Sequence, residues 1–85
     1  MTDREVPVEI TVHEFFVNNW EDPDMAAAST LYAWEHSEVG QWIIQRSISV
    51  PAWYRLDLSI SGGYRYEIRA LVMPHIATEF YLRWG

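Results

Sequence analysis

The 85-residue sequence contains no cysteine and no lysine, and none of its apolar runs is long enough to cross a membrane. The absence of cysteine excludes disulfide bonds, thiolate metal sites and a thiol nucleophile. The N-terminus has no basic segment followed by an apolar stretch, which is the pattern of a secretion signal. We therefore expect a cytoplasmic protein that does not associate with membranes.

Charge is distributed unevenly along the chain. The net charge is −6, and all six basic residues are arginine. The first 40 residues hold nine acids and one arginine, whereas the remaining 45 hold five arginines and three acids. Nucleic-acid affinity comes mostly from lysine and arginine side chains that neutralise phosphates. We therefore expect no direct binding to nucleic acid and a protein as the partner.

Length and composition predict a single domain over residues 1–85. A chain of this size buries only about 60% of its unfolded surface. Apolar residues make up 49% of the sequence and aromatic residues 15%, which is more aromatic surface than a small interior needs. Some rings should therefore be exposed. Trp20 and Trp53 fall in predicted connections, where large rings can anchor a protein interface.

The first half predicts one strand and one helix. Apolar residues alternate with polar ones from Val6 to Val12, as in a half-buried strand, and a bulge is expected near Glu14. The sequence Asp22-Pro23-Asp24 then has the features of a helix start. We expect one helix from Pro23 to about Glu38, with a capping glycine after it. The alternative is a strand over 29–36, which would make the fold all-β.

The second half predicts further strands. Residues 41–50 alternate as a strand would, and turns at 61–63 and 74–76 divide the rest into an antiparallel meander. One common register places Leu56 opposite Ile68, and Ala70 opposite Phe80. Leu56, Leu58, Ile60 and Ile68 should then point inward. The expected fold is α+β, with one helix packed on a four- to five-stranded antiparallel sheet.

Catalytic and metal-binding signatures are weak. His13, His36 and His75 each lie near an acid, but no pair of histidines has a chelating spacing. None of the serines lies in a Gly-x-Ser-x-Gly motif. We expect no cofactor, no metal and no enzymatic activity. A small metal-dependent hydrolase that uses one of these histidines is the least favoured alternative.

Candidate partner-binding residues are therefore acidic or aromatic, with one exception. Arg46 falls on the inward face of the strand expected at 41–50, where its guanidinium either anchors a partner's carboxylate or phosphate or extends past the sheet edge. The acids are the residues that could contact a basic surface. The candidate set is Trp20, Glu21, Asp22, Asp24, Glu35, Glu38, Arg46 and Trp53.

Two short segments carry a resemblance to known proteins. Residues 34–42 (WEHSEVGQW) and 78–85 (TEFYLRWG) resemble parts of small uncharacterised phage-encoded proteins. This resemblance implies a phage accessory protein that works in the host cytoplasm, a class that includes inhibitors of host enzymes. It implies no activity.

The leading hypothesis is a non-enzymatic acidic protein that acts by protein-protein contact. Its acids would occupy the basic surface of a nucleic-acid-binding host enzyme and so inhibit that enzyme. A second hypothesis is a structural subunit of a symmetric homo-oligomer or a virion component, because a small antiparallel sheet has open edges that a second copy could cover as a homodimer.

Overall fold

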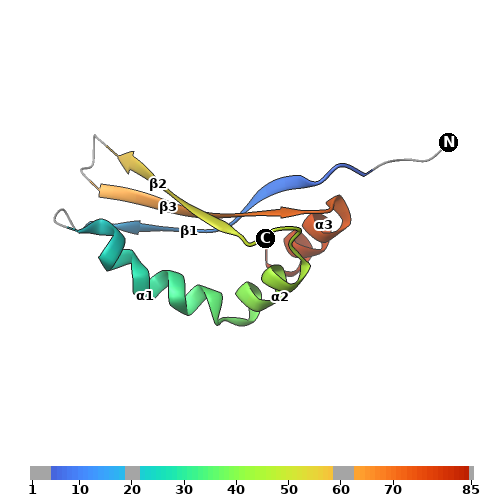
Figure 1. Ribbon diagram of the computed structural model, residues 1–85, viewed down its shortest axis with the longest axis horizontal. Helices are drawn as coiled ribbons and strands as arrows, with labels where there is room; N and C mark the ends of the chain where they lie inside the picture. Colours follow the sequence, from blue (N-terminus) through green and yellow to red (C-terminus); the bar gives the residue numbers. More distant parts are fainter. Residues whose placement is uncertain (1–4, 19–21, 59–62, 85) are drawn as a thin grey trace.

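The computed structural model describes residues 5–18, 22–58 and 63–84, and it contains one sheet and three helices in that part of the chain (Figure 1). The strands form an antiparallel sheet in the order β1-β3-β2, with β3 in the centre. The α+β class agrees with the sequence, but the expected single helix and four to five strands are wrong. The elements are β1 (Val8–Val17), α1 (Pro23–Glu35), α2 (Glu38–Arg46), β2 (Ala52–Leu58), β3 (Gly63–Val72) and α3 (Pro74–Arg83).

The hydrophobic core lies on one face of the sheet. Side chains alternate along β3, and Ile68, Ala70 and Val72 point toward the helices. All three helices contribute to the same buried cluster, so they lie on the same side of the sheet. The opposite face of the sheet has no helix on it in the described part of the chain. The helical residues of the core are Trp34 from α1, Ile43 from α2, and Ala77 and Phe80 from α3.

The expected N-terminal strand is present as β1, and its bulge lies slightly earlier than predicted. Thr11 pairs with Arg69 and His13 with Ile68, so Val12 is the extra residue. The bulge keeps Val12 buried and then turns His13 toward the helices.

The predicted helix start is confirmed, but the helix ends sooner than expected. The Asp22 carboxylate accepts a hydrogen bond from the Met25 backbone N–H at 3.0 Å, and Pro23 occupies the first helical position. The chain turns after Glu35, and the Ser37 hydroxyl begins α2 by accepting from the Gly40 N–H at 3.0 Å. Gly40 thus lies in the first turn of α2 and does not cap the end of α1. Because α1 is helical through Glu35, the alternative of a strand over 29–36 is also wrong.

Two segments expected to be strands are helices. Residues 41–46 belong to α2, because Val39 and Ile43 are four apart and face the core together, and Ser37 caps the helix. Pro74 begins α3 as its first residue, so it does not form a turn between strands. The expected pairing of Ala70 with Phe80 is therefore wrong, and β1 lies beside β3 instead.

The register between β2 and β3 also differs from the prediction. Leu56 pairs with Arg65 and not with Ile68, and Trp53 takes the position opposite Ile68. This odd shift places Leu56 on the helix-free face and Trp53 on the helix side. Leu56 therefore does not point into the core, whereas Ile68 does. Ile60 and most of the expected turn, residues 61 and 62, lie outside the described residues.

The close contact between α1 and α2 generates the first prediction, for Gly40→Ala. In an unobstructed helix this change raises stability by about 1 kcal/mol. Here the new Cβ would collide with the backbone carbonyl of Trp34, which cannot move without shifting the end of α1. We expect the free energy of unfolding to fall by about 1–3 kcal/mol in urea denaturation. Gln45→Ala, at an exposed position of the same helix, should change the free energy of unfolding little. A Gly40→Ala variant more stable than wild type would contradict the close contact between Gly40 and the end of α1.

Candidate functional site

An apolar pocket of about 280 Å³ lies between α1, α2 and the beginning of β2. Its walls come from three elements that are separated in the sequence, and its base is Ile68 of the central strand. Glu35 is the one acidic residue of the lining. The lining residues are Leu31, Trp34, Glu35, Ile44, Val50, Pro51, Trp53 and Ile68.

One side of α1 faces this pocket and the neighbouring strand β2. Residues 24, 28, 31 and 35 fall on one stripe of the helix because they are spaced by three or four. Asp24 at the start of the stripe contacts β2, and Leu31 and Glu35 at its end line the pocket. Ala28 in the middle of the stripe is small and exposed. The stripe therefore connects the Asp24–Arg55 contact with the pocket.

The connection between α2 and β2 forms the opposite rim. The Ile48 backbone N–H donates to the Leu71 carbonyl at 2.8 Å, and this bond holds the connection against β3. Val50 follows at the rim with 87% of its surface exposed. Pro51 then leads directly into β2, where the Trp53 ring lies 5.6 Å from the ring of Tyr66. Trp53 lines the pocket and remains 46% exposed, so part of it is open to solvent.

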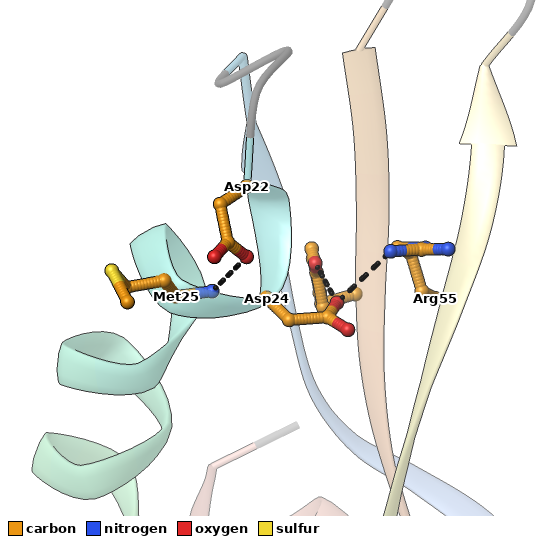
Figure 2. Close-up of polar contacts among 5 residues, drawn as sticks. Asp22, Asp24, Met25 and Arg55 are labelled. Carbon is orange, nitrogen blue, oxygen red and sulfur yellow. Dashed lines mark hydrogen bonds and ion pairs between the residues drawn. The ribbon is translucent and has the colours of Figure 1, made fainter.

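Asp24 connects α1 to both neighbouring strands (Figure 2). Its Oδ1 atom accepts a hydrogen bond from the Tyr66 hydroxyl at 2.7 Å and lies 3.1 Å from a guanidinium nitrogen of Arg55. Burial and the Asp24 carboxylate raise the pKa of Tyr66 to about 12. Tyr66 is therefore protonated at neutral pH and donates this bond constantly. The contact fixes the start of α1 on the sheet, and thereby the position of the wall that faces the pocket.

The structure separates the predicted partner-binding residues into groups. Glu35 and Trp53 meet at the pocket, whereas Asp24 lies at the other end of α1, about 16 Å away along the helix axis. Asp22 caps α1 and Glu38 lies exposed in the first turn of α2. Trp20 and Glu21 lie outside the described residues.

Arg46 does not lie on an inward strand face, because its segment is helical. It ends α2, where it donates to the Trp42 carbonyl at 3.0 Å. Its guanidinium carbon lies 4.3 Å from the centre of the Trp42 ring, a cation–π contact. The exposed Arg46 side chain thus packs on its own helix.

The apolar wall of the pocket was missed by sequence reasoning. Leu31 and Trp34 contributed only to the helical pattern of the first half, and Ile44 and Val50 only to the strand expected over 41–50. The helical spacing of Asp24, Leu31 and Glu35 was the one available signal that these side chains share a face. That spacing does not tell which strand the face meets, because the β2–β3 register decides this.

The helix-free face of the sheet carries a ladder of charges. The Glu67 carboxylate is largely buried between two arginines, with nitrogen–oxygen distances of 3.1 Å to Arg65 and 2.9 Å to Arg69. The Arg69 guanidinium also lies 4.3 Å from the centre of the Tyr54 ring. Near one end of this face, Phe16 is 63% exposed. The face is therefore mixed in character, with paired charges at its centre and an exposed ring on β1.

The three histidines lie on or beside three different elements. His13 on β1 stacks with Trp34, and burial lowers its pKa, although Glu14 opposes this shift. A ring nitrogen of His36 lies 2.9 Å from the Tyr32 carbonyl, and His75 lies 3.7 Å from a carboxylate oxygen of Glu5. Over residues 5–18, 22–58 and 63–84, no three histidine or acidic side chains gather as a metal site would require.

Comparison of the chain with protein-family models, curated proteins and solved structures finds no match. In the described part of the chain, no helix has the length and apolar character needed to cross a membrane. The pocket between α1, α2 and β2 is therefore the feature from which a function has to be inferred.

The contact at Asp24 generates the second prediction, for Tyr66→Phe. This change removes one hydrogen bond to a carboxylate, and we expect the free energy of unfolding at neutral pH to fall by about 1–2 kcal/mol. Tyr64→Phe is the matched control, because its ring contacts Arg55 but its hydroxyl makes no hydrogen bond to the described residues. Urea denaturation measures both variants.

Comparison of the wild type with Tyr66→Phe at increasing pH tests the raised pKa of Tyr66. The folded state holds this proton more tightly than the unfolded state, so the stability it contributes is complete below pH 10 and is lost as the pH rises toward about 12. The difference between wild type and Tyr66→Phe should therefore narrow across this range. A constant difference would show that Tyr66 titrates at an ordinary pKa.

Proposed function

We propose that the chain is a protein-binding module whose partner inserts into the pocket between α1, α2 and β2. The observation that carries this proposal is an open apolar pocket with a half-exposed tryptophan at its mouth. Trp53 could bury much more of its ring if a partner covered it, and tryptophan is among the residues that contribute most to binding energy in protein interfaces.

The surroundings of the pocket support the same proposal. Val50 at the rim is an exposed apolar residue, and Leu31, Trp34 and Ile44 behind it are apolar. Covering such a surface removes apolar area from water and stabilises a complex by about 25 cal/mol per Å² before the costs of association. Glu35 provides one charge beside this surface, which favours partners that place a cation there.

The distribution of the acids changes the hypothesis drawn from the sequence. Asp24 is engaged with Arg55 and Tyr66, and it is remote from Glu35. Contact with a basic partner surface therefore rests on Glu35 and its apolar neighbours, and a broad acidic surface that imitates nucleic acid receives no support from this arrangement. Inhibition of a host enzyme remains one way in which such a module could act.

The third prediction locates the partner's contact by photocrosslinking. The photoreactive residue p-benzoylphenylalanine replaces Val50 in one protein and Tyr32 in a control. Tyr32 is also exposed, but it is not among the residues that line the pocket. In lysate of the cells that produce the protein, we expect a discrete crosslinked species from position 50 and none from position 32.

The anchor residue gives the complementary measurement. Trp53→Ala should weaken binding of that crosslinked partner about tenfold or more, as measured by competition with unlabelled protein. The far-ultraviolet circular dichroism spectrum and the melting temperature of the variant must first match those of the wild-type protein. Equal labelling from positions 50 and 32, or a partner insensitive to Trp53→Ala, would contradict the proposed function.

A symmetric homo-oligomer is the second candidate, and the helix-free face of the sheet favours it. Phe16 is exposed there, and Tyr54 and Leu56 on β2 lie on the same face. A second copy packed on this face would cover these side chains and one side of the sheet.

The fourth prediction distinguishes this candidate from the first. If the chain forms such a dimer, light scattering should give twice the monomer mass, and Phe16→Arg should return the protein to a monomer. Met25→Arg replaces an apolar side chain on α1 that is also largely exposed, and should leave the dimer intact. A wild-type monomer would eliminate this second candidate without affecting the first.

A further inference from the structure

We infer that the occupant of the pocket is an extended segment of a partner protein, which pairs with the free edge of β2 and carries a basic residue near its apolar anchor. This inference rests on the proposed function and adds the conformation and the chemistry of the ligand.

The free edge of β2 provides the first argument. In the described part of the chain, β2 has β3 on one side and no strand on the other. Alternate residues of an edge strand direct their N–H and C=O groups outward, and an extended peptide can pair with them. The pocket begins at Trp53, the second residue of β2, so an anchor side chain in the pocket would hold its backbone beside this edge.

The other edge of the sheet is less suited to strand addition. β1 carries a bulge at Val12, which interrupts the regular spacing of its outward backbone groups. Helices α1 and α3 also pack against β1. By contrast, β2 pairs with β3 without a register shift from Ala52 to Leu58, so its outer edge is regular over seven residues.

The stripe on α1 leaves space for such a segment. Asp24 reaches Arg55 in the middle of β2, and Leu31 and Glu35 reach the pocket at the beginning of the strand. Between them Ala28 projects only a methyl group and is exposed. The β2 edge is therefore accompanied by a low wall, which would contact the inward side chains of an added strand.

Glu35 determines the charge of the ligand. No arginine or histidine of the described residues pairs with its carboxylate, although Asp24, Glu67 and Glu79 all have arginine partners. Side chains two positions apart in a strand point the same way and are about 7 Å apart. A lysine or arginine two residues from a bulky apolar anchor would therefore reach the Glu35 carboxylate, and the chain's net charge of −6 also favours a basic ligand.

The fifth prediction uses a displayed library of random nonapeptides selected on the full-length chain. We expect enriched peptides to combine a bulky apolar residue with lysine or arginine two positions away. Their affinities, measured by fluorescence anisotropy, should fall about two- to fivefold in Glu35→Gln, the range for an exposed ion pair. Glu35→Arg should reverse the preference toward acidic peptides. Glu38→Arg, an exposed change of the same kind outside the pocket lining, should not.

Backbone methylation tests the extended pairing directly. N-methyl groups at one alternate set of peptide residues would remove the hydrogen bonds to β2 and should reduce affinity about tenfold or more. The same groups at the other set, which faces away from the edge, should be tolerated. Selective loss from one set would support strand addition, because a helical or irregular ligand has no such two-residue period.

The outcomes separate this inference from the proposed function. Two results would overturn the inference and leave the proposed binding module intact. In the first, the selected peptides compete with crosslinking at position 50 but keep their affinity after N-methylation of either set of residues. In the second, they compete but lack an enriched lysine or arginine. Failure to enrich any peptide would also overturn it, because a nine-residue strand should suffice to fill the pocket and pair with β2. Peptides that bind Trp53→Ala as well as wild type would contradict both.

Discussion

The position of α1 on the sheet depends on the contact of Asp24 with Tyr66 and Arg55. A helix of 13 residues is marginal in isolation, and α1 buries only part of one side. The Tyr66 hydroxyl, within the core beneath the helix start, fixes that end at 2.7 Å from Asp24. The Asp22 cap and Pro23 begin the helix at this point, so local sequence and tertiary contact agree. The same helix carries Leu31, Trp34 and Glu35 of the pocket lining at its far end.

The pocket is open because the helices cover the sheet unevenly. α1 packs against β1 and α2 packs against β3, whereas β2 meets α1 chiefly through the Asp24–Arg55 pair and the pocket lining. With β2 at the edge, Trp53 has a neighbour on its β3 side and solvent on the other. The same geometry that leaves the ring half exposed also leaves the backbone of β2 available for pairing.

The sequence predicted the features that depend on local chemistry. Asp22 and Pro23 defined a helix start because a cap and an N-terminal proline act within one turn, and the alternation from Val6 to Val12 defined a strand. The prediction from sequence was wrong where the apolar residues of a short segment fit both the two-residue period of a strand and the 3.6-residue period of a helix. Trp42 and Ile44 alternate as in a strand, but Val39 and Ile43 have helical spacing, and the Ser37 cap decided between them. Pro74 is equally typical of a turn and of a first helical residue.

The site shows the same division. Trp53 and Glu35 were both named from the sequence, one as an exposed ring and one as an acid, but their meeting at one pocket required the β2–β3 register. The sequence placed Trp53 in a connection, and the expected partner of Leu56 was wrong by three residues, so the position of Trp53 opposite Ile68 was not predicted. Register in a hairpin depends on loop length, and adjacent glycines with flanking serines allow several lengths. No property of Trp53 alone could have shown which face it takes.

Pairing with arginine neutralises only some of the acids in the described part of the chain. Arginines of the second half neutralise Asp24 between α1 and β2, Glu67 within β3 and Glu79 within α3. The effect of an acid on binding then depends on its surroundings more than on the net charge. A carboxylate beside an apolar pocket becomes partly shielded from water when a ligand binds, so its attraction for a cation increases at that moment. Glu35 has such surroundings, whereas Glu38, three residues later in the chain, is outside the pocket lining and remains a solvated charge.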